Sequence, residues 1–128
     1  MRIEISQLPP ASSNPNWTGH WTERYQEARV YHDAVFYSCV DARNRAYLEG
    51  MSFPFVKATL KLTLVFAEQR RRDMNNFLAS FKPGLDAIVD AGLCIDDSAE
   101  FLQISGVDIL VDSDRAPLTV IEIKALAG

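Results

Sequence analysis

The length, composition and charge of the chain exclude several classes of protein. Its 128 residues suffice for one domain with a continuous core, and 48% hydrophobic with 23% charged residues excludes a disordered chain. No apolar run approaches the roughly 20 residues of a membrane-spanning helix, and the opening MRIEISQLPP lacks the apolar core of a signal peptide. Cys39 and Cys94 match no metal-binding spacing, so we expect buried free thiols. We therefore expect a single domain over residues 1–128, in the cytoplasm, with no membrane partner.

The first half of the chain predicts a strand, a loop, a long helix and a second strand. Residues 2–8 alternate as a short strand, and the prolines and asparagines that follow predict a loop. From about 22 to 48 apolar residues recur every three or four positions, which indicates a helix that stops at Gly50. Residues 57–66 alternate strictly, as in a strand with one buried face. The expected inward side chains are Tyr25, Ala28, His32, Val35, Cys39 and Ala42 on the helix, and Ala58, Leu60, Leu62, Leu64 and Phe66 on the strand.

The second half predicts an interrupted helix and two more strands. Residues 73–91 have a helical pattern, but Pro83 cannot lie in an undisturbed helix interior. We therefore expect a kink near Phe81–Lys82 or a new helix that begins at Pro83, ending at Gly92. Residues 101–111 and 118–124 are predicted strands, joined by the turn-forming DSDRAP. The predicted fold is an α+β domain with a small mixed sheet and two main helices.

The charges are distributed unevenly along the chain. A formal net charge of −4 does not by itself indicate a nucleic-acid-binding protein. Between Lys57 and Lys82, however, six basic residues stand against two acidic ones, and the run Arg70–Arg72 is followed directly by Asp73. Such a run is commonly a solvated face, so the carboxylate that ends it is the informative feature.

Three carboxylates flank the predicted helix of residues 73–91. Asp73 precedes the helix and Asp96–Asp97 follow it, so a fold at the Pro83 break and a short loop would bring both ends to one edge of the sheet. Like charges gathered in this way repel each other unless a cation joins them. Magnesium takes hard oxygen ligands, and in phosphodiester cleavage it activates water and stabilises charge. An Asp pair after a helix is also a common polar turn, and spacing alone favours that interpretation over a metal site.

The segment from Arg70 to Asp97 resembles the signature of the RusA-type Holliday junction resolvases, small dimeric α+β nucleases that cut four-way DNA junctions with magnesium. The family's pattern is a basic run, an Asp, one residue, a second Asp and an Asn, then a Lys in the following helix and an Asp pair after a Gly. Here the segment reads RRRDMNN, then FKPGLD, then Ile95-Asp96-Asp97 after Gly92. The resemblance covers nearly the whole chain, from the strand before Pro9-Pro10 to the closing VIEIK.

The resemblance implies a magnesium site formed by Asp73, Asn75, Asp96 and Asp97. We expect Asp97 to be a closer ligand than Asp96, whose side chain either supports the ligands from outside or lies in the turn. The family's second Asp is Asn75 here, and an amide oxygen can bind magnesium but contributes no charge. Asp73, Asp97 and Lys82 are the implied catalytic residues. Lys82 stands four residues before Asp86, as the family's Lys stands before its own Asp, and would balance charge on the phosphate or the leaving oxygen.

The resemblance also implies how DNA is bound. The guanidinium forks of Arg70, Arg71 and Arg72 suit phosphate, and Asn14, Asn16 and His20 are further candidates in the N-terminal loop. For His20 and Trp21, packing against the core is the competing expectation. A homodimer would supply two active sites for the two symmetry-related strands of a junction. The apolar helical face around residues 35–40 also favours a dimer.

Two alternatives remain open. Asp108 on one predicted strand and Glu122-x-Lys124 on the next resemble the acid-and-lysine core of restriction-type nucleases. In addition, the loss of a carboxylate at Asn75 leaves open a catalytically weakened or inactive protein that binds branched DNA without cutting it.

Overall fold

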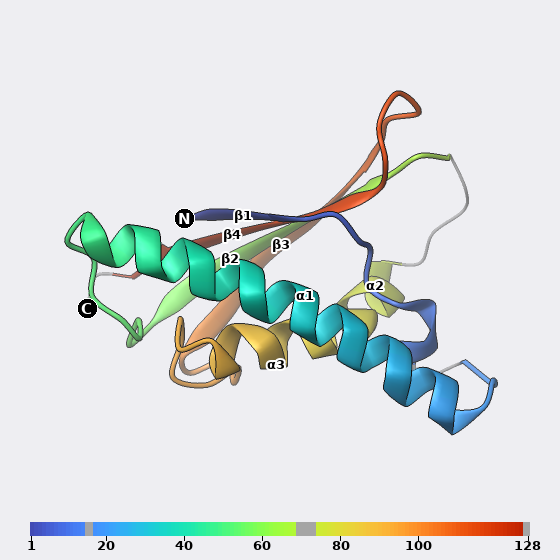
Figure 1. Ribbon diagram of the computed structural model, residues 1–128, viewed down its shortest axis with the longest axis horizontal. Helices are drawn as coiled ribbons and strands as arrows, with labels where there is room; N and C mark the ends of the chain where they lie inside the picture. The colour runs from blue at the N-terminus through green and yellow to red at the C-terminus, as the bar shows by residue number, and fades with distance from the viewer. Residues whose placement is uncertain (15–16, 69–73, 127–128) are drawn as a thin grey trace.

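The computed structural model describes residues 1–14, 17–68 and 74–126. It has a mixed α+β fold in which helices cover one face of a four-stranded sheet (Figure 1). In chain order the elements are β1 (Arg2–Ile5), the 3-10 helix η1 (Ala11–Ser13), α1 (Trp21–Leu48), β2 (Ala58–Phe66), α2 (Met74–Ser80), α3 (Lys82–Asp90), β3 (Leu102–Val111) and β4 (Leu118–Ala125). Among the described residues, no helix combines the length and apolar character needed to cross a membrane.

The sheet has the strand order β1-β4-β2-β3. β2 runs parallel to β3 and antiparallel to β4, so the predicted mixed sheet is confirmed. A parallel pair needs a crossover connection, and α2 and α3 supply it here. The link from β3 to β4 passes the end of β2, where the backbone N–H of Asp112 donates to the carbonyl of Phe66 at 2.9 Å. α1 lies across the sheet with α3 beside it (Figure 1).

α1 forms where the periodicity predicts it, but its buried face starts later. The Nδ1 atom of His20 accepts a hydrogen bond from the backbone N–H of Thr22 at 3.1 Å and caps the first turn. Tyr25, expected inward, is 59% exposed, whereas Tyr31 is 1% exposed. Tyr25 lies six residues before Tyr31 and so points about 120° away from it around the helix, off the buried face of Tyr31, Val35 and Cys39. The N-terminal end of α1 also extends past the sheet (Figure 1).

The core confirms the alternation of β2. Ala58, Leu60, Leu62 and Leu64 are fully buried beneath the helices. The opposite face is less open to water than expected, because Val65 is buried there with Leu118 and Val120. β1 is shorter than predicted and ends at Ile5, since residues beyond it have no partner on β4, whose pairing with β1 stops at Thr119.

Buried polar and sulfur groups join α1 to the rest of the core. The Tyr31 hydroxyl donates to Thr119 Oγ1 at 2.9 Å, and the Thr119 hydroxyl donates to the carbonyl of Gln7 at 2.7 Å. Cys39 and Cys94 are free and buried, as expected, and burial raises the pKa of Cys39 to about 12 and of Cys94 to about 11. Neither thiol is therefore reactive near neutral pH.

Candidate active site

The start of α3 is fixed by an aromatic anchor. The predicted break falls at Phe81, which separates α2 from α3 and is fully buried. Its ring meets Tyr31 edge-on with ring centroids 6.2 Å apart. A side chain at Gly84 would come within 2.5 Å of the Phe81 ring, so only glycine permits this close packing. Phe81 thereby holds the next residue, Lys82, at a defined point on the surface.

Lys82 is the first residue of α3, and its ammonium group meets two carboxylates. The Nζ atom lies 3.0 Å from Asp86 Oδ1, one helical turn along, and donates a hydrogen bond to Oδ2 of Asp97, 15 residues further along the chain. α3 has nine residues and is about 13.5 Å long. Gly92, at φ 79°, reverses the chain after α3, and the following segment is long enough to return along the helix to Lys82.

Lys82 and Asp97 shift each other's pKa in opposite directions. Hydrogen bonds with Asp97 and Asp86 raise the pKa of Lys82, and the hydrogen bond from Lys82 lowers the pKa of Asp97. Both groups are therefore charged near neutral pH. The Lys82 side chain is 59% exposed and that of Asp97 24%. An ion pair this exposed to solvent adds little to the stability of the fold, but both of its groups remain accessible to a ligand.

The remaining predicted metal ligands are only partly within the described structure. Asp96 Oδ1 accepts a hydrogen bond from the backbone N–H of Asp97 at 2.8 Å, so the Asp96 side chain contacts the backbone of its own loop. Asn75 belongs to α2, which begins at Met74. Asp73, together with the predicted DNA-binding residues Asn16, Arg70, Arg71 and Arg72, lies outside the described residues. Within the described ranges, no three His, Cys, Asp or Glu side chains form a metal-binding group.

The N-terminal loop places its candidates away from the core. Trp21 is 73% exposed and stacks on His20 with ring centroids 5.8 Å apart, so the expectation that these rings pack inward is wrong. The Arg24 guanidinium donates to the carbonyl of Asn14 at 2.8 Å and to that of Ser12 at 2.5 Å. It also lies 5.6 Å from the Trp17 ring centroid. Arg24 therefore holds the loop against α1.

A second cluster of ionisable side chains, centred on His32, lies beside Lys82, and the sequence does not predict it. His32 Nε2 lies 2.8 Å from Asp90 Oδ2, and its Nδ1 lies 3.0 Å from Asp33 Oδ1. The first contact joins α1 to α3 across 58 residues, a separation that gives no signal in a single sequence. The Lys82–Asp86 pair, by contrast, has the i,i+4 spacing of a helical ion pair, which the sequence alone could have indicated.

The alternative nuclease residues lie on two strands that are not neighbours in the sheet. In the sheet, β2 lies between the strand of Asp108 and the strand of Glu122 and Lys124. Adjacent strands are about 4.8 Å apart, so the strands of Asp108 and Glu122 are about 10 Å apart. Lys61 occupies the intervening position opposite Glu122 and pairs with Asp108 at 3.1 Å. These residues form a charge ladder across the open face of the sheet.

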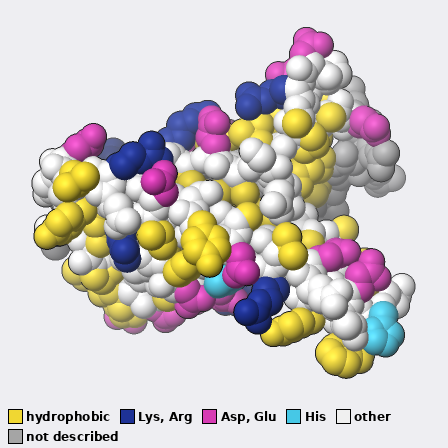
Figure 2. Space-filling view, viewed as in Figure 1, with side chains coloured by type: hydrophobic (Ala, Val, Ile, Leu, Met, Phe, Trp, Pro, Cys, Tyr) yellow, Lys and Arg dark blue, Asp and Glu magenta, His cyan; other side chains and the backbone are white. Residues whose placement is uncertain are grey.

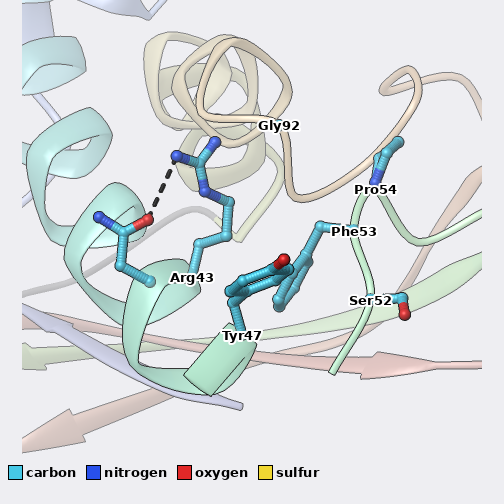
Figure 3. Close-up of a pocket in the computed structure, with 7 residues that line it drawn as sticks. Arg43, Tyr47, Ser52, Phe53, Pro54 and Gly92 are labelled. Carbon is cyan, nitrogen blue, oxygen red and sulfur yellow. Dashed lines mark hydrogen bonds between the residues drawn. The ribbon is translucent and has the colours of Figure 1, made fainter. Parts of the chain in front are cut away.

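A separate hollow of about 510 Å³ lies near the other end of α1. Figure 3 shows the Tyr47 and Phe53 rings next to each other at its wall, with Arg43 above them. The Arg43 guanidinium donates to the carbonyl of Ala91 at 2.7 Å and to Asn44 Oδ1 at 3.3 Å. Because the residues that line this hollow include no carboxylate, it offers no match to the predicted metal chemistry.

Comparison with known proteins finds similarity to a relative of uncharacterized function. A protein of Xylella fastidiosa (strain Temecula1), described only as uncharacterized, is 41% identical over 91 residues, which cover 70% of this chain and 56% of that protein. The chain thus spans a little over half of that relative's length. No protein-family model matches the chain.

Proposed function

We propose that the chain is a magnesium-dependent endonuclease of the RusA type, which hydrolyses phosphodiester bonds in branched DNA such as the four-way junction. One observation carries the proposal. Lys82 and Asp97 are in direct contact, and they are the two residues that the resemblance assigns to the catalytic lysine and to the closer metal ligand. Spacing along the chain does not require this contact, so it is independent support for the assignment.

The charge balance around Lys82 favours a cation over a phosphate as the first ligand. One positive charge on Lys82 faces the carboxylates of Asp86 and Asp97, and Asp96 stands beside them. This local excess of negative charge would repel an isolated phosphate, whereas carboxylate oxygens are the ligands that magnesium prefers. Asp97 and Asp96 would hold the ion, with Asp73 and Asn75 completing the set that the resemblance implies. A bound ion would supply an activated water and stabilise charge on the reacting phosphate.

Lys82 has two roles under this proposal. In the free protein its ammonium group offsets the repulsion between Asp86 and Asp97 and keeps the Asp97 carboxylate ionised. When the DNA backbone is bound, the same group donates to a phosphate oxygen or to the leaving oxygen, where added positive charge lowers the barrier. Its exposed position allows both contacts, and Asp86 holds the side chain in place between them.

A second candidate function rests on Asn75. If the amide leaves the site too weakly charged to hold magnesium, the protein would bind branched DNA without cutting it. Both candidates predict DNA binding, and only the first predicts strand cleavage. The restriction-type alternative is not favoured, because Lys61 lies between Asp108 and Glu122.

The test is an assay of cleavage on a four-way junction beside a linear duplex of the same sequence, in magnesium and in chelator. We expect cuts in the junction in magnesium alone. Junction binding without cleavage would favour the second candidate, and the absence of preferential binding to the junction would overturn both.

A further inference from the structure

A groove between α1 and α3 opens directly beside Lys82. Its volume is about 430 Å³, within the range of small-ligand sites in proteins. The residues that line it are Tyr25, Ala28, Arg29, His32, Asp33, Lys82, Pro83 and Asp86. Lys82 therefore belongs both to the groove and to the contact with Asp97.

The wall of the groove is apolar and carries an exposed aromatic ring. Tyr25 is 59% exposed, so it contributes little to the core. Ala28 and Pro83 add apolar surface without hydrogen-bonding side chains. Arg29 Nη1 donates to the Tyr25 hydroxyl at 3.3 Å, a contact that keeps the guanidinium at the edge of the ring. This combination of a ring and an adjacent guanidinium is suited to stacking against a planar group.

The rim of the groove presents both donors and acceptors. Arg29 and Lys82 donate, whereas the carboxylates of Asp33 and Asp86 accept. A phosphate carries only acceptors, so the two carboxylates would repel it. The edge of a nucleobase carries donors and acceptors side by side, and its faces are apolar and flat. Figure 2 shows hydrophobic, basic, acidic and histidine side chains next to one another on this face of the molecule.

We propose that this groove binds one nucleobase, that of the nucleotide next to the phosphate held at Lys82. The inference rests on the proposed function and extends it from a site that cuts to a site that selects where to cut. The base stacks on Tyr25, and its edge meets Arg29 and Asp33. Taking a base out of a duplex costs energy, least where it is already unpaired or unstacked. A branch point offers such a base, so the groove favours branched over linear DNA.

The experiment compares junction binding by four proteins: the wild type and its Tyr25→Ala, Tyr25→Phe and Tyr47→Ala variants. Tyr47 is a matched control, because it lies on the same helix, is 69% exposed and is absent from the residues that line the groove. Binding is measured in calcium to hold back cleavage, on four junctions that differ only in the base beside the branch point. We expect Tyr25→Ala to bind about tenfold more weakly and to lose the preference among the four bases. Tyr47→Ala should resemble the wild type. Tyr25→Phe keeps the ring but loses the hydroxyl that accepts from Arg29, so its binding should fall between that of the wild type and that of Tyr25→Ala.

The outcomes separate this proposal from the proposed function. If Tyr25→Ala and Tyr47→Ala bind alike while the wild type still binds and cuts junctions, the base site is wrong and the nuclease stands. An Arg29→Gln variant distinguishes a groove that binds a nucleobase from one that binds a phosphate of the DNA backbone. If it lowers the salt dependence of binding and leaves the base preference intact, the groove holds a phosphate and the proposal is overturned. If the wild type binds no DNA, both proposals fall together.

Discussion

The ammonium group of Lys82 donates a hydrogen bond to the carboxylate of Asp97, which ties the first residue of α3 to the loop that follows the helix. The contact closes a loop of the chain around α3. It also places a basic group against Asp97, the carboxylate for which the resemblance implies a role as metal ligand. The first prediction follows from this pair.

Lys82→Ala should lower the rate of junction cleavage by at least about 100-fold, the usual cost of removing a charge-stabilising donor. The variant should still bind junctions, because the backbone contacts implied for Arg70–Arg72 are untouched. Single-turnover cleavage at saturating protein measures the rate separately from binding. Lys61→Ala is the control, since Lys61 is also an exposed lysine in an ion pair with an aspartate. Loss of cleavage in Lys61→Ala but not in Lys82→Ala would point instead to the residues around Asp108.

Asn75→Asp should increase magnesium affinity and junction cleavage, whereas Asp73→Asn should abolish cleavage. Asn and Asp have nearly the same shape, so the exchange adds a charge to the site without changing its geometry, and affinity for hard cations rises with ligand charge. The gain should be clearest at low magnesium in a titration of the cleavage rate. Asn44→Asp, beside the hollow near the other end of α1, is the control for a general effect of negative charge. Superimposable magnesium curves for the wild type and Asn75→Asp would remove Asn75 from the site.

The protein is expected to be a homodimer in solution. The resemblance and the two symmetry-related strands of a junction support this prediction. The apolar face of α1 no longer does, because Val35 and Cys39 are fully buried and Phe36 and Val40 pack against the chain's own core. Light scattering at micromolar concentration should return twice the mass of the chain. A monomer mass would require the two strands of a junction to be cut in separate binding events.

His32 should make stability depend on pH. Partial burial lowers the pKa of His32, but the hydrogen bonds with Asp33 and Asp90 raise it by more, so the net shift is upward. The protonated form therefore stabilises the folded state. This contribution is complete below the unfolded pKa of about 6.5 and is lost as the pH rises through the higher folded pKa.

The measurement is urea unfolding of the wild type and His32→Gln at about pH 5.5 and pH 8.5. The variant should lose more stability at the lower pH, and Asp90→Asn should reduce the pH dependence in the same direction. An equal loss at both pH values would show that the ion pairs of His32 do not contribute to stability.

The chain of hydrogen bonds from the buried Tyr31 through Thr119 to the carbonyl of Gln7 should be sensitive to its middle member. Tyr31→Phe removes one bond, and Thr119 still donates to Gln7, so we expect a loss of about 1 kcal/mol of unfolding free energy. Thr119→Val leaves both the Tyr31 hydroxyl and the Gln7 carbonyl unpaired and should cost about 2–3 kcal/mol. Tyr47→Phe, on the exposed side of α1, should be neutral in the same unfolding experiment. A smaller loss for Thr119→Val than for Tyr31→Phe would contradict this order.

The sequence by itself determined the elements of the fold. The alternation of β2, the period of α1 and the break at Phe81 all follow from local patterns, because side-chain burial repeats with the geometry of the backbone. Proline fixes its own φ and removes a backbone donor wherever it stands, so Pro83 predicted a boundary without knowledge of any partner. Lys82 and Asp86 likewise meet through helical spacing alone.

Only the tertiary structure decided which distant residues meet and which surfaces are covered. The contact of Lys82 with Asp97 depends on the path of the chain after Gly92, and that of His32 with Asp90 depends on the packing of α1 against α3. No local pattern encodes either of them. Tyr25 and Tyr31 stand on the same helix with similar chemistry, yet one is exposed and the other buried, because only Tyr31 lies on the face of α1 that Phe81 and Thr119 cover. The strand order separates Asp108 from Glu122, since β2 is inserted between two strands that are neighbours in sequence. Periodicity describes the face that an element presents, whereas packing decides whether anything lies against it.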